Sequence, residues 1–181
     1  MKISVLISDA NHPIMDSLSE WVEFQRNSGK SVAILHDAQH LTSGDFLFLV
    51  SCSQILKPEE MRNFTHSLVL HASDLPEGRG WSPHIWKILE GGNKITVSVL
   101  DAVSSVDRGD IWAQTHFYLE GHELFDEINE KLFEAELSLM TKVVESYAHI
   151  SPVPQKTGGT YYRKRSPADS VIDANKTISE Q

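Results

Sequence analysis

The sequence of 181 residues contains a single cysteine, Cys52, so no disulfide can form within the chain. We interpret Cys52 as a small packed side chain rather than a nucleophile. Long apolar runs are missing as well, because no stretch reaches the roughly 18 residues that a membrane helix needs. The apolar run near the N-terminus ends at Ser8 and Asp9, too early for the core of a signal peptide. We therefore expect a soluble, cytoplasmic protein without a membrane partner.

Positive charge is scarce. The 16 Lys and Arg residues are outnumbered by 25 Asp and Glu residues, which gives a formal net charge of −9. A general nucleic-acid binder needs a basic face, so we expect no nucleic-acid partner. Hydrophobic residues make up 40% of the chain and aromatic residues 8%, as in globular proteins. The length fits one domain, and association into a homo-oligomer stays open.

Apolar runs alternate with amphipathic segments along the chain. The runs 31–36 and 45–52 are almost continuously apolar, which is typical of parallel strands covered on both faces, whereas 94–101 and 110–119 alternate as half-exposed strands do. Further strands are expected at 2–8 and 67–71, and helices from an Asn11 cap to Gly29 and at 58–64, 82–92 and 122–149. This order predicts an α/β, Rossmann-like fold with a mainly parallel twisted sheet and helices on both faces. We expect a catalytic domain over 1–150 and a polar C-terminal tail over 151–181, entered through a linker-like segment at 151–160.

The strand 67–71 ends on His71 and runs into a turn rich in proline and glycine, "HASDLPEGRGWSP". In open α/β sheets, ligands bind outside the carboxyl ends of the strands, so His71 and Asp101 are candidates for a site. Pro76 and the glycines stiffen the turn and allow a substrate to approach the backbone. The alternative is that a backbone partner simply satisfies His71 at the strand end.

Two motifs in this region resemble the folate-dependent formyltransferases, which include methionyl-tRNA formyltransferase and bacterial sugar N-formyltransferases. The first is His71 with Ser73, Leu75 and Pro76, followed by Arg79-Gly80. The second is the loop Asp107-Arg108-Gly109-Asp110. The resemblance is good over residues 44–120. It implies the Rossmann-like formyltransferase fold and an enzyme that moves a formyl group from 10-formyltetrahydrofolate to an amine.

By this resemblance, His71 is the catalytic acid–base group and Asp107 orients its imidazole. An imidazole can accept and donate a proton near neutral pH, and such catalysis is typically worth about 10²–10⁴ in rate. The alternative for Asp107 is a turn residue that accepts backbone N–H groups. One departure stands out, because the family has an asparagine two residues before the histidine, whereas this chain has Val69. Loss of such an oxyanion donor typically costs about 10²–10³ in turnover.

The resemblance also assigns binding residues. The folate is expected to contact Gln54, Ile55, Leu56, Asp101 and Val106, although Ile55 and Leu56 could equally be ordinary core. The acceptor is expected to contact Ser73, Arg79, Gly80, Trp81, Tyr162 and Arg163. His36 and His40 lack a third ligand, so we expect no metal.

The acceptor implied by "RGWSPHIW" and by "GGTYYRKRSPADSVID" is an amino sugar, free or nucleotide-linked, of a surface-polysaccharide pathway. An amino-acid acceptor, a folate-binding module impaired by Val69, and a hydrolase that releases formate to water are the alternatives. The basic run Arg163-Lys164-Arg165 either solubilises the tail or folds back toward the Arg79 turn to hold an anionic acceptor.

Overall fold

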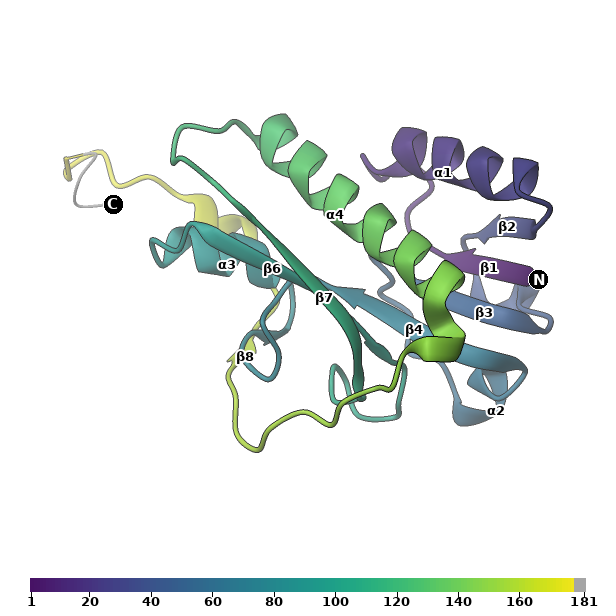
Figure 1. Cartoon of the computed structure of the whole chain (residues 1–181). Helices are drawn as coiled ribbons and strands as arrows, with labels where there is room; N and C mark the ends of the chain where they lie inside the picture. The colour runs from purple at the N-terminus through teal and green to yellow at the C-terminus, as the bar shows by residue number, and fades with distance from the viewer. Residues whose placement is uncertain (178–181) are drawn as a thin grey trace.

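A mixed six-stranded sheet forms the centre of the protein, whose computed structural model describes residues 1–177 (Figure 1). The strand order is β2-β1-β3-β4-β6-β7, in which β1 to β4 run parallel, while β6 is antiparallel to β4 and β7 is antiparallel to β6. The strands are β1 (Lys2–Leu6), β2 (Ser31–Leu35), β3 (Gly44–Leu49), β4 (Phe64–His71), β6 (Lys94–Asp101) and β7 (Ile111–Tyr118). The predicted α/β class and mainly parallel sheet are confirmed.

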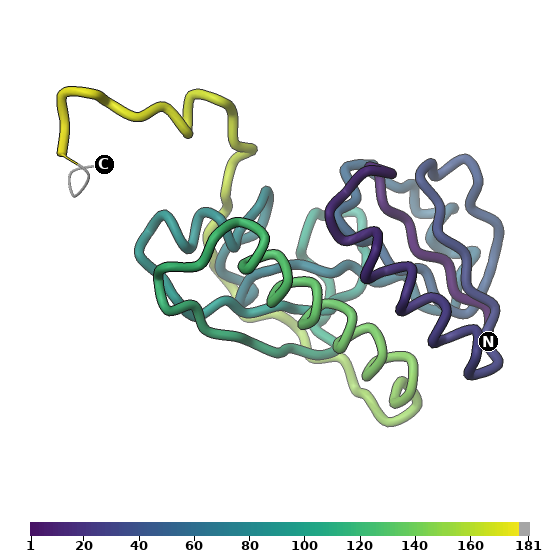
Figure 2. The backbone as a smooth tube through the Cα atoms, turned by 90° about the horizontal axis from the view of Figure 1, so that it is seen from above, coloured from purple at the N-terminus to yellow at the C-terminus, as the bar shows by residue number. Residues whose placement is uncertain are grey.

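Helices cover both faces of the sheet. The two long helices, α1 (Met15–Asn27) and α4 (Phe125–Ser146), lie side by side on one face, as the view from above also shows (Figure 2). The short α2 (Pro58–Met61) packs near β4 on the other face, and α3 (Pro83–Leu89) lies beside β6. Single 3-10 turns are η1 (Ala38–His40), η2 (Tyr147–His149) and η3 (Pro167–Ser170).

The pleat of β3 shows why its apolar run is almost continuous. Phe46 and Phe48 point into the large core under α1 and α4, whereas Leu47 and Leu49 point into a smaller core on the opposite face. Both faces of this strand are therefore removed from water, as expected for an inner parallel strand.

Several predicted boundaries and exposures were wrong. Asn11 does not cap the first helix: its N–H donates to Asp9 Oδ1 in a separate turn, and the helix begins only at Met15. The strand predicted as half-exposed at 94–101 is mostly buried between β4 and β7. Its polar Ser98 is tolerated there because the hydroxyl donates to Ser73 O at 2.7 Å. The last long helix is shorter than predicted, since residues 147–149 tighten into η2.

The segment 151–160 is fixed on the body of the protein rather than being a loose linker. Val153 pairs with Ile111 of β7 in an isolated antiparallel bridge, and further on β8 (Tyr161–Tyr162) pairs in parallel with β5 (Arg79–Gly80). Gly159 has a φ of +98°, and a Cβ there would collide with Pro76 O. After β8 the chain extends away from the sheet toward the C-terminus (Figure 2). No helix among residues 1–177 is long and apolar enough to cross a membrane.

Candidate active site

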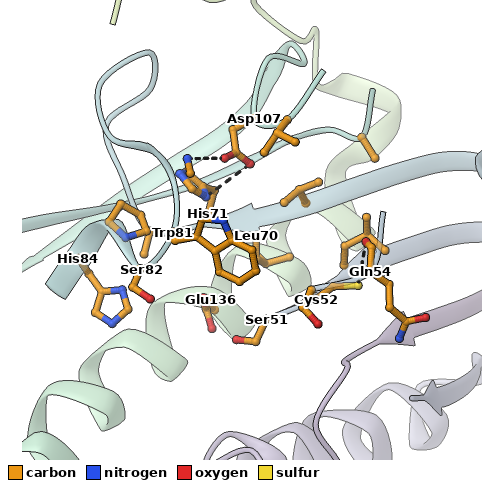
Figure 3. Close-up of a pocket in the computed structure, with 18 of the residues that line it drawn as sticks. Ser51, Cys52, Gln54, Leu70, His71, Trp81, Ser82, His84, Asp107 and Glu136 are labelled. Atoms are coloured by element: carbon orange, nitrogen blue, oxygen red, sulfur yellow. Dashed lines mark hydrogen bonds and ion pairs between the residues drawn. The ribbon is translucent and has the colours of Figure 1, made fainter. Parts of the chain in front are cut away.

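A cavity of about 680 Å³ lies beyond the carboxyl ends of β3 and β4. Its walls come from the chain after β1, the segment after β3, the end of β4, the β5–α3 turn, the loop after β6 and one side of α4 (Figure 3). This volume falls in the range of about 300–1,000 Å³ that is usual for sites of small molecules and cofactors.

His71 closes β4 and reaches this cavity. The residue is only 7% exposed, and its Nε2 lies 2.9 Å from Gly78 O. A carbonyl oxygen only accepts hydrogen bonds, so Nε2 carries the proton and Nδ1 is left as the basic nitrogen. Nδ1 lies 3.6 Å from Asp107 Oδ1. The backbone partner of the alternative interpretation is thus present, and it selects the tautomer in which Nδ1 can take up a proton.

The backbone of Asp107 has a φ of +54°, a conformation that residues other than glycine rarely adopt. Its Oδ2 accepts the N–H of Gly80 at 2.8 Å, and its carbonyl oxygen accepts bonds from the side chains of Arg79 and Gln155. Among residues 1–177, the other non-glycine residues with positive φ are Ser51 and Ser82, and all three line the cavity. Strained backbone of this kind gathers at functional sites, where surrounding contacts hold it in place.

Arg79 and Gly80 position Asp107. The Arg79 guanidinium is buried and donates to Asp107 O, Gly158 O and Gln155 Oε1. Gly80 has a φ of +94°, and a Cβ there would collide with Tyr162 O. Arg79 and Gly80 therefore join β5, the Asp107 loop and the segment 155–162, and we call this set of contacts the clamp. Arg79 does not line the cavity, and its contacts favour a positioning role. Gly80 does line the cavity, so its predicted contact with the acceptor stays a prediction.

A family model described as formyl transferase matches residues 1–144. The chain belongs to the formyl transferase family. This family uses tetrahydrofolate derivatives and transfers one-carbon groups. The methionyl-tRNA formyltransferase of a Nitratiruptor species is 30% identical over 142 residues, 78% of this chain and 46% of that protein. That of Finegoldia magna is 30% identical over 104 residues, 57% of this chain and 34% of that protein. The chain thus spans between a third and a half of these curated relatives.

Solved formyltransferases share the fold. Methionyl-tRNA formyltransferase from Clostridium thermocellum superposes with a TM-score of 0.80 at 22% identity, covering 99% of this chain and 79% of that one. The formyltransferase PseJ from Anoxybacillus kamchatkensis, solved with UDP-4,6-dideoxy-4-formamido-L-AltNAc and tetrahydrofolate, gives 0.71 at 22% identity, covering 90% and 86%. At these identities the similarity establishes the fold, and the predicted Rossmann-like formyltransferase fold is confirmed.

The residues predicted to bind folate all line the cavity of this formyl transferase chain. Ile55 is 86% exposed and Val106 is exposed, so both offer apolar surface, whereas Leu56 is buried. The Gln54 amide is occupied, since it accepts from Ala38 N and donates to His36 O. Asp101 accepts from Trp112 Nε1, and because β6 is antiparallel it pairs with Leu68 rather than lying beside the end of β4. Burial raises the pKa of Asp101. Volume and apolar lining fit a folate, and Ile55, Leu56 and Val106 are the side chains that would hold its ring.

The predicted acceptor residues are scattered. Trp81 lines the cavity, but Ser73 is buried beside it and does not line it. Tyr162 stacks on Trp86 at 5.8 Å and donates to Glu90, and Arg163 lies 4.9 Å from the Trp86 ring. Burial, and then Glu90, raise the pKa of Tyr162 to about 12.

The tail does fold back on the Arg79 turn, but its cations have partners within the tail or on the β5–α3 turn. Arg163 forms an ion pair with Asp169, Lys164 lies 4.8 Å from the Trp81 ring, and Arg165 donates to Ser170 Oγ. No group of three or more His, Cys, Asp or Glu side chains in the described part of the chain is arranged to hold a metal ion.

Sequence reasoning missed Glu136 and His84, both on the cavity wall. Burial raises the pKa of Glu136 to about 8, and burial, with a smaller contribution from His71, lowers the pKa of His84 to about 4. A signal for Glu136 was available. It lies four residues after Leu132 and three before Leu139, so the helical period puts it on the apolar side of α4, not on the solvated face.

Proposed function

We propose that this chain is an N-formyltransferase that moves the formyl group of 10-formyltetrahydrofolate to the amine of an amino sugar, free or nucleotide-linked. The observation that carries the proposal is the pair His71 and Asp107, held 3.6 Å apart on the wall of a folate-sized cavity in a formyl transferase fold. The reduced folate donor and a single free thiol suit the reducing cytoplasm as the location.

The chemistry needs one proton to move. The acceptor nitrogen bonds to the formyl carbon, the bond from that carbon to N10 of the folate breaks, and a proton lost by the amine is delivered to N10. We assign the transfer to His71 Nδ1, which is the basic ring nitrogen because Nε2 donates to Gly78 O. The Asp107 carboxylate beside Nδ1 stabilises the imidazolium that forms after the proton is taken up.

Val69 cannot donate a hydrogen bond to the oxyanion of the tetrahedral intermediate. Val69 lines the cavity and packs beside the smaller core, so an apolar side chain stands where the family has an amide. Asn129 of α4 lines the same cavity and is buried. We propose that Asn129 or a backbone N–H of the cavity wall takes over this task. If neither does, the chain is a folate-binding module with little turnover.

Methionyl-tRNA is the second candidate acceptor, because the curated relatives are named methionyl-tRNA formyltransferases. The net charge of −9 argues against it, since a transfer RNA is bound through cationic surface. The sugar acceptor draws its support from PseJ, which was solved with a formylated nucleotide sugar.

One experiment separates these functions. The purified chain is incubated with 10-formyltetrahydrofolate and, separately, with free amino hexoses, UDP-linked 4-amino sugars, free amino acids and methionyl-tRNA. Mass spectrometry then looks for a gain of about 28 Da on each acceptor, and free formate is measured in parallel. A formylated amino sugar supports the proposal. Formate without any acceptor identifies the hydrolase, and formylation of methionyl-tRNA or an amino acid alone refutes the sugar assignment.

A further inference from the structure

Two buried polar atoms on the helical wall of the cavity have no hydrogen-bond partner among the described residues. They are Glu136 Oε2 on α4 and His84 Nδ1 on α3. Glu136 is only 6% exposed. A third polar residue of this wall, Asn129, is buried two helical turns before Glu136. In Figure 3, His84 and Gln54 lie at opposite ends of the cavity, and Glu136 lies between them.

Buried polar groups without a partner are rare, because each one loses the hydrogen bonds that it made to water. Among the described residues, the other buried side-chain atoms without a partner belong to Gln25, Ser73 and Arg165, none of which lines the cavity. Only the Glu136 and His84 atoms lie where a bound molecule could supply the missing hydrogen bond. Burial raises the pKa of Glu136 to about 8 and lowers that of His84 to about 4, so both are mainly neutral at pH 7. They can therefore act as hydrogen-bond donors and acceptors toward a neutral polar ligand.

The charges of the side chains that line the cavity further restrict the chemical class of its ligand. None of the described residues that line it is a lysine or an arginine, while Asp101 and Asp107 are acidic and Glu136 is mainly neutral. A phosphate or carboxylate would find no fixed cation here. The part of the acceptor that enters must therefore be neutral or cationic, and polar enough to use two hydrogen-bonding groups. An amine with a neighbouring hydroxyl meets this description, and an amino acid with its carboxylate does not.

We propose that Glu136 and His84 form the acceptor subsite, in which Glu136 accepts a hydrogen bond from the amine to be formylated and His84 hydrogen-bonds a neighbouring hydroxyl. The assignment rests on the proposed function and adds the substrate class, a neutral amino alcohol, to it. Two fixed contacts would aim the lone pair of the amine at the formyl carbon, and orientation of this kind is a large part of catalysis. The phosphates of a nucleotide-linked sugar would lie outside the cavity.

The test measures acceptor and donor binding separately. Wild type, Glu136→Leu and His84→Phe, which lack the two hydrogen-bonding groups, are saturated with tetrahydrofolate, and binding of 4-amino-4-deoxyglucose is followed by ligand-observed NMR. Three comparison ligands are used: glucose lacks the amine, cyclohexylamine lacks the hydroxyls, and glutamate carries extra negative charge. We expect the amino sugar to bind wild type best and each variant to weaken its binding by about 10- to 100-fold. Binding of tetrahydrofolate itself should stay within about twofold of wild type.

Glu134→Leu is the matched control, because Glu134 is an exposed carboxylate on the same helix. It should leave both affinities unchanged. If Glu136→Leu fails to fold, His84→Phe tests the wall from a different helix. Unchanged amino-sugar binding in both folded variants would overturn the subsite, and would mean that water alone satisfies the two atoms. An equal loss of tetrahydrofolate binding would overturn it as well, by assigning this wall to the folate.

The subsite and the proposed function can fail independently. Amino-sugar binding that depends on Glu136, in a chain that transfers no formyl group, would refute the function and leave the subsite in place. Formyl transfer with an acceptor KM that neither variant changes would refute the subsite and keep the function. A wild type that binds none of the amines would refute the subsite outright.

Discussion

The two walls of the cavity satisfy their polar groups in opposite ways. On the strand wall, His71 Nε2 is bonded to Gly78 O and Asp107 Oδ2 to Gly80 N. Behind this wall, the Arg79 guanidinium donates to three oxygens of the protein. On the helix wall, Glu136 Oε2 and His84 Nδ1 have no partner within the described residues. The same cavity thus joins a completed hydrogen-bond network to an incomplete one.

The difference separates two tasks. A group that moves a proton must be held in one geometry before the substrate arrives, and bonds within the protein achieve this. A group that recognises a substrate must keep bonding capacity for it, at the expense of stability in the free protein. Mutations on the strand wall should therefore change turnover, and mutations on the helix wall should change acceptor affinity and stability.

The largest effect is expected from His71→Asn. The variant lacks a group that can carry the proton, so kcat should fall by about 10²–10⁴-fold. Tetrahydrofolate affinity, measured by fluorescence titration, should change little, because the ring is fixed by its own backbone contact rather than by the folate residues. Turnover above about a tenth of wild type would contradict the assignment.

Glu136→Leu should change how stability depends on pH. Burial raises the pKa of Glu136 from 4.5 to about 8, so between these values the folded chain keeps a proton that the unfolded chain has lost. The free energy of unfolding of the wild type should therefore fall as the pH rises from about 4.5 to 8, by an amount on the order of several kcal/mol. Urea titrations across this range should show the fall in wild type and not in the variant.

His84 acts in the opposite direction in the same titrations. Its lowered pKa means that its contribution to stability is present above about 6.5 and is lost as the pH falls toward 4. The Glu136→Leu variant should keep this loss of stability toward pH 4. A wild type with no fall toward pH 8, or a Glu136→Leu variant that keeps this fall, would show that Glu136 is not held neutral.

Asp107→Asn keeps the shape of the side chain but removes the charge beside His71 Nδ1. We expect kcat to fall by about 10- to 100-fold and acceptor KM to change less than about threefold, since the loss concerns the imidazolium rather than binding. Steady-state kinetics with both substrates varied gives the two constants. If kcat is unchanged, Asp107 is only a turn residue that accepts the Gly80 N–H.

Arg79→Gln should loosen the strand wall. The change leaves Gly158 O and Gln155 Oε1 without the guanidinium that donates to them, which should lower the free energy of unfolding by about 1–3 kcal/mol. Urea denaturation measures this loss. The control is Arg108→Gln, which changes an exposed arginine in the Asp107 loop. Its free energy of unfolding should stay within about 0.5 kcal/mol of wild type. Equal stability of the two variants would refute the clamp.

The smallest effect is expected from the tail. Arg163 and Arg165 already have partners in Asp169 and Ser170, so replacing both by Gln should leave both KM values and the salt dependence of kcat/KM close to wild type. This expectation replaces the acceptor contact inferred from the sequence. A rise in acceptor KM that disappears at high salt would restore the anionic-acceptor hypothesis.

The motifs around His71 and Asp107 determined much of the site from the sequence alone, because they carry the spacing of the family. The α/β class followed from apolar periodicity, which depends only on burial and on the helix and strand repeats. The boundary errors arose where local bonds replaced the expected cap, as in the Asp9 turn before α1.

The tertiary structure decided which charged groups are solvated and which are buried. Arg79 reads as a free cation until segments about 76 to 79 residues later, at Gln155 and Gly158, are seen to take up its guanidinium. The helical period places Glu136 on the apolar side of α4, but only the fold shows that α3, α4 and the strand ends enclose one cavity around its carboxyl group. Neither outcome is local, because burial of a side chain depends on neighbours that the chain brings together only on folding. The sequence by itself therefore determined the family and predicted its proton-transfer pair, and the fold alone decided which polar atoms have no partner among the described residues.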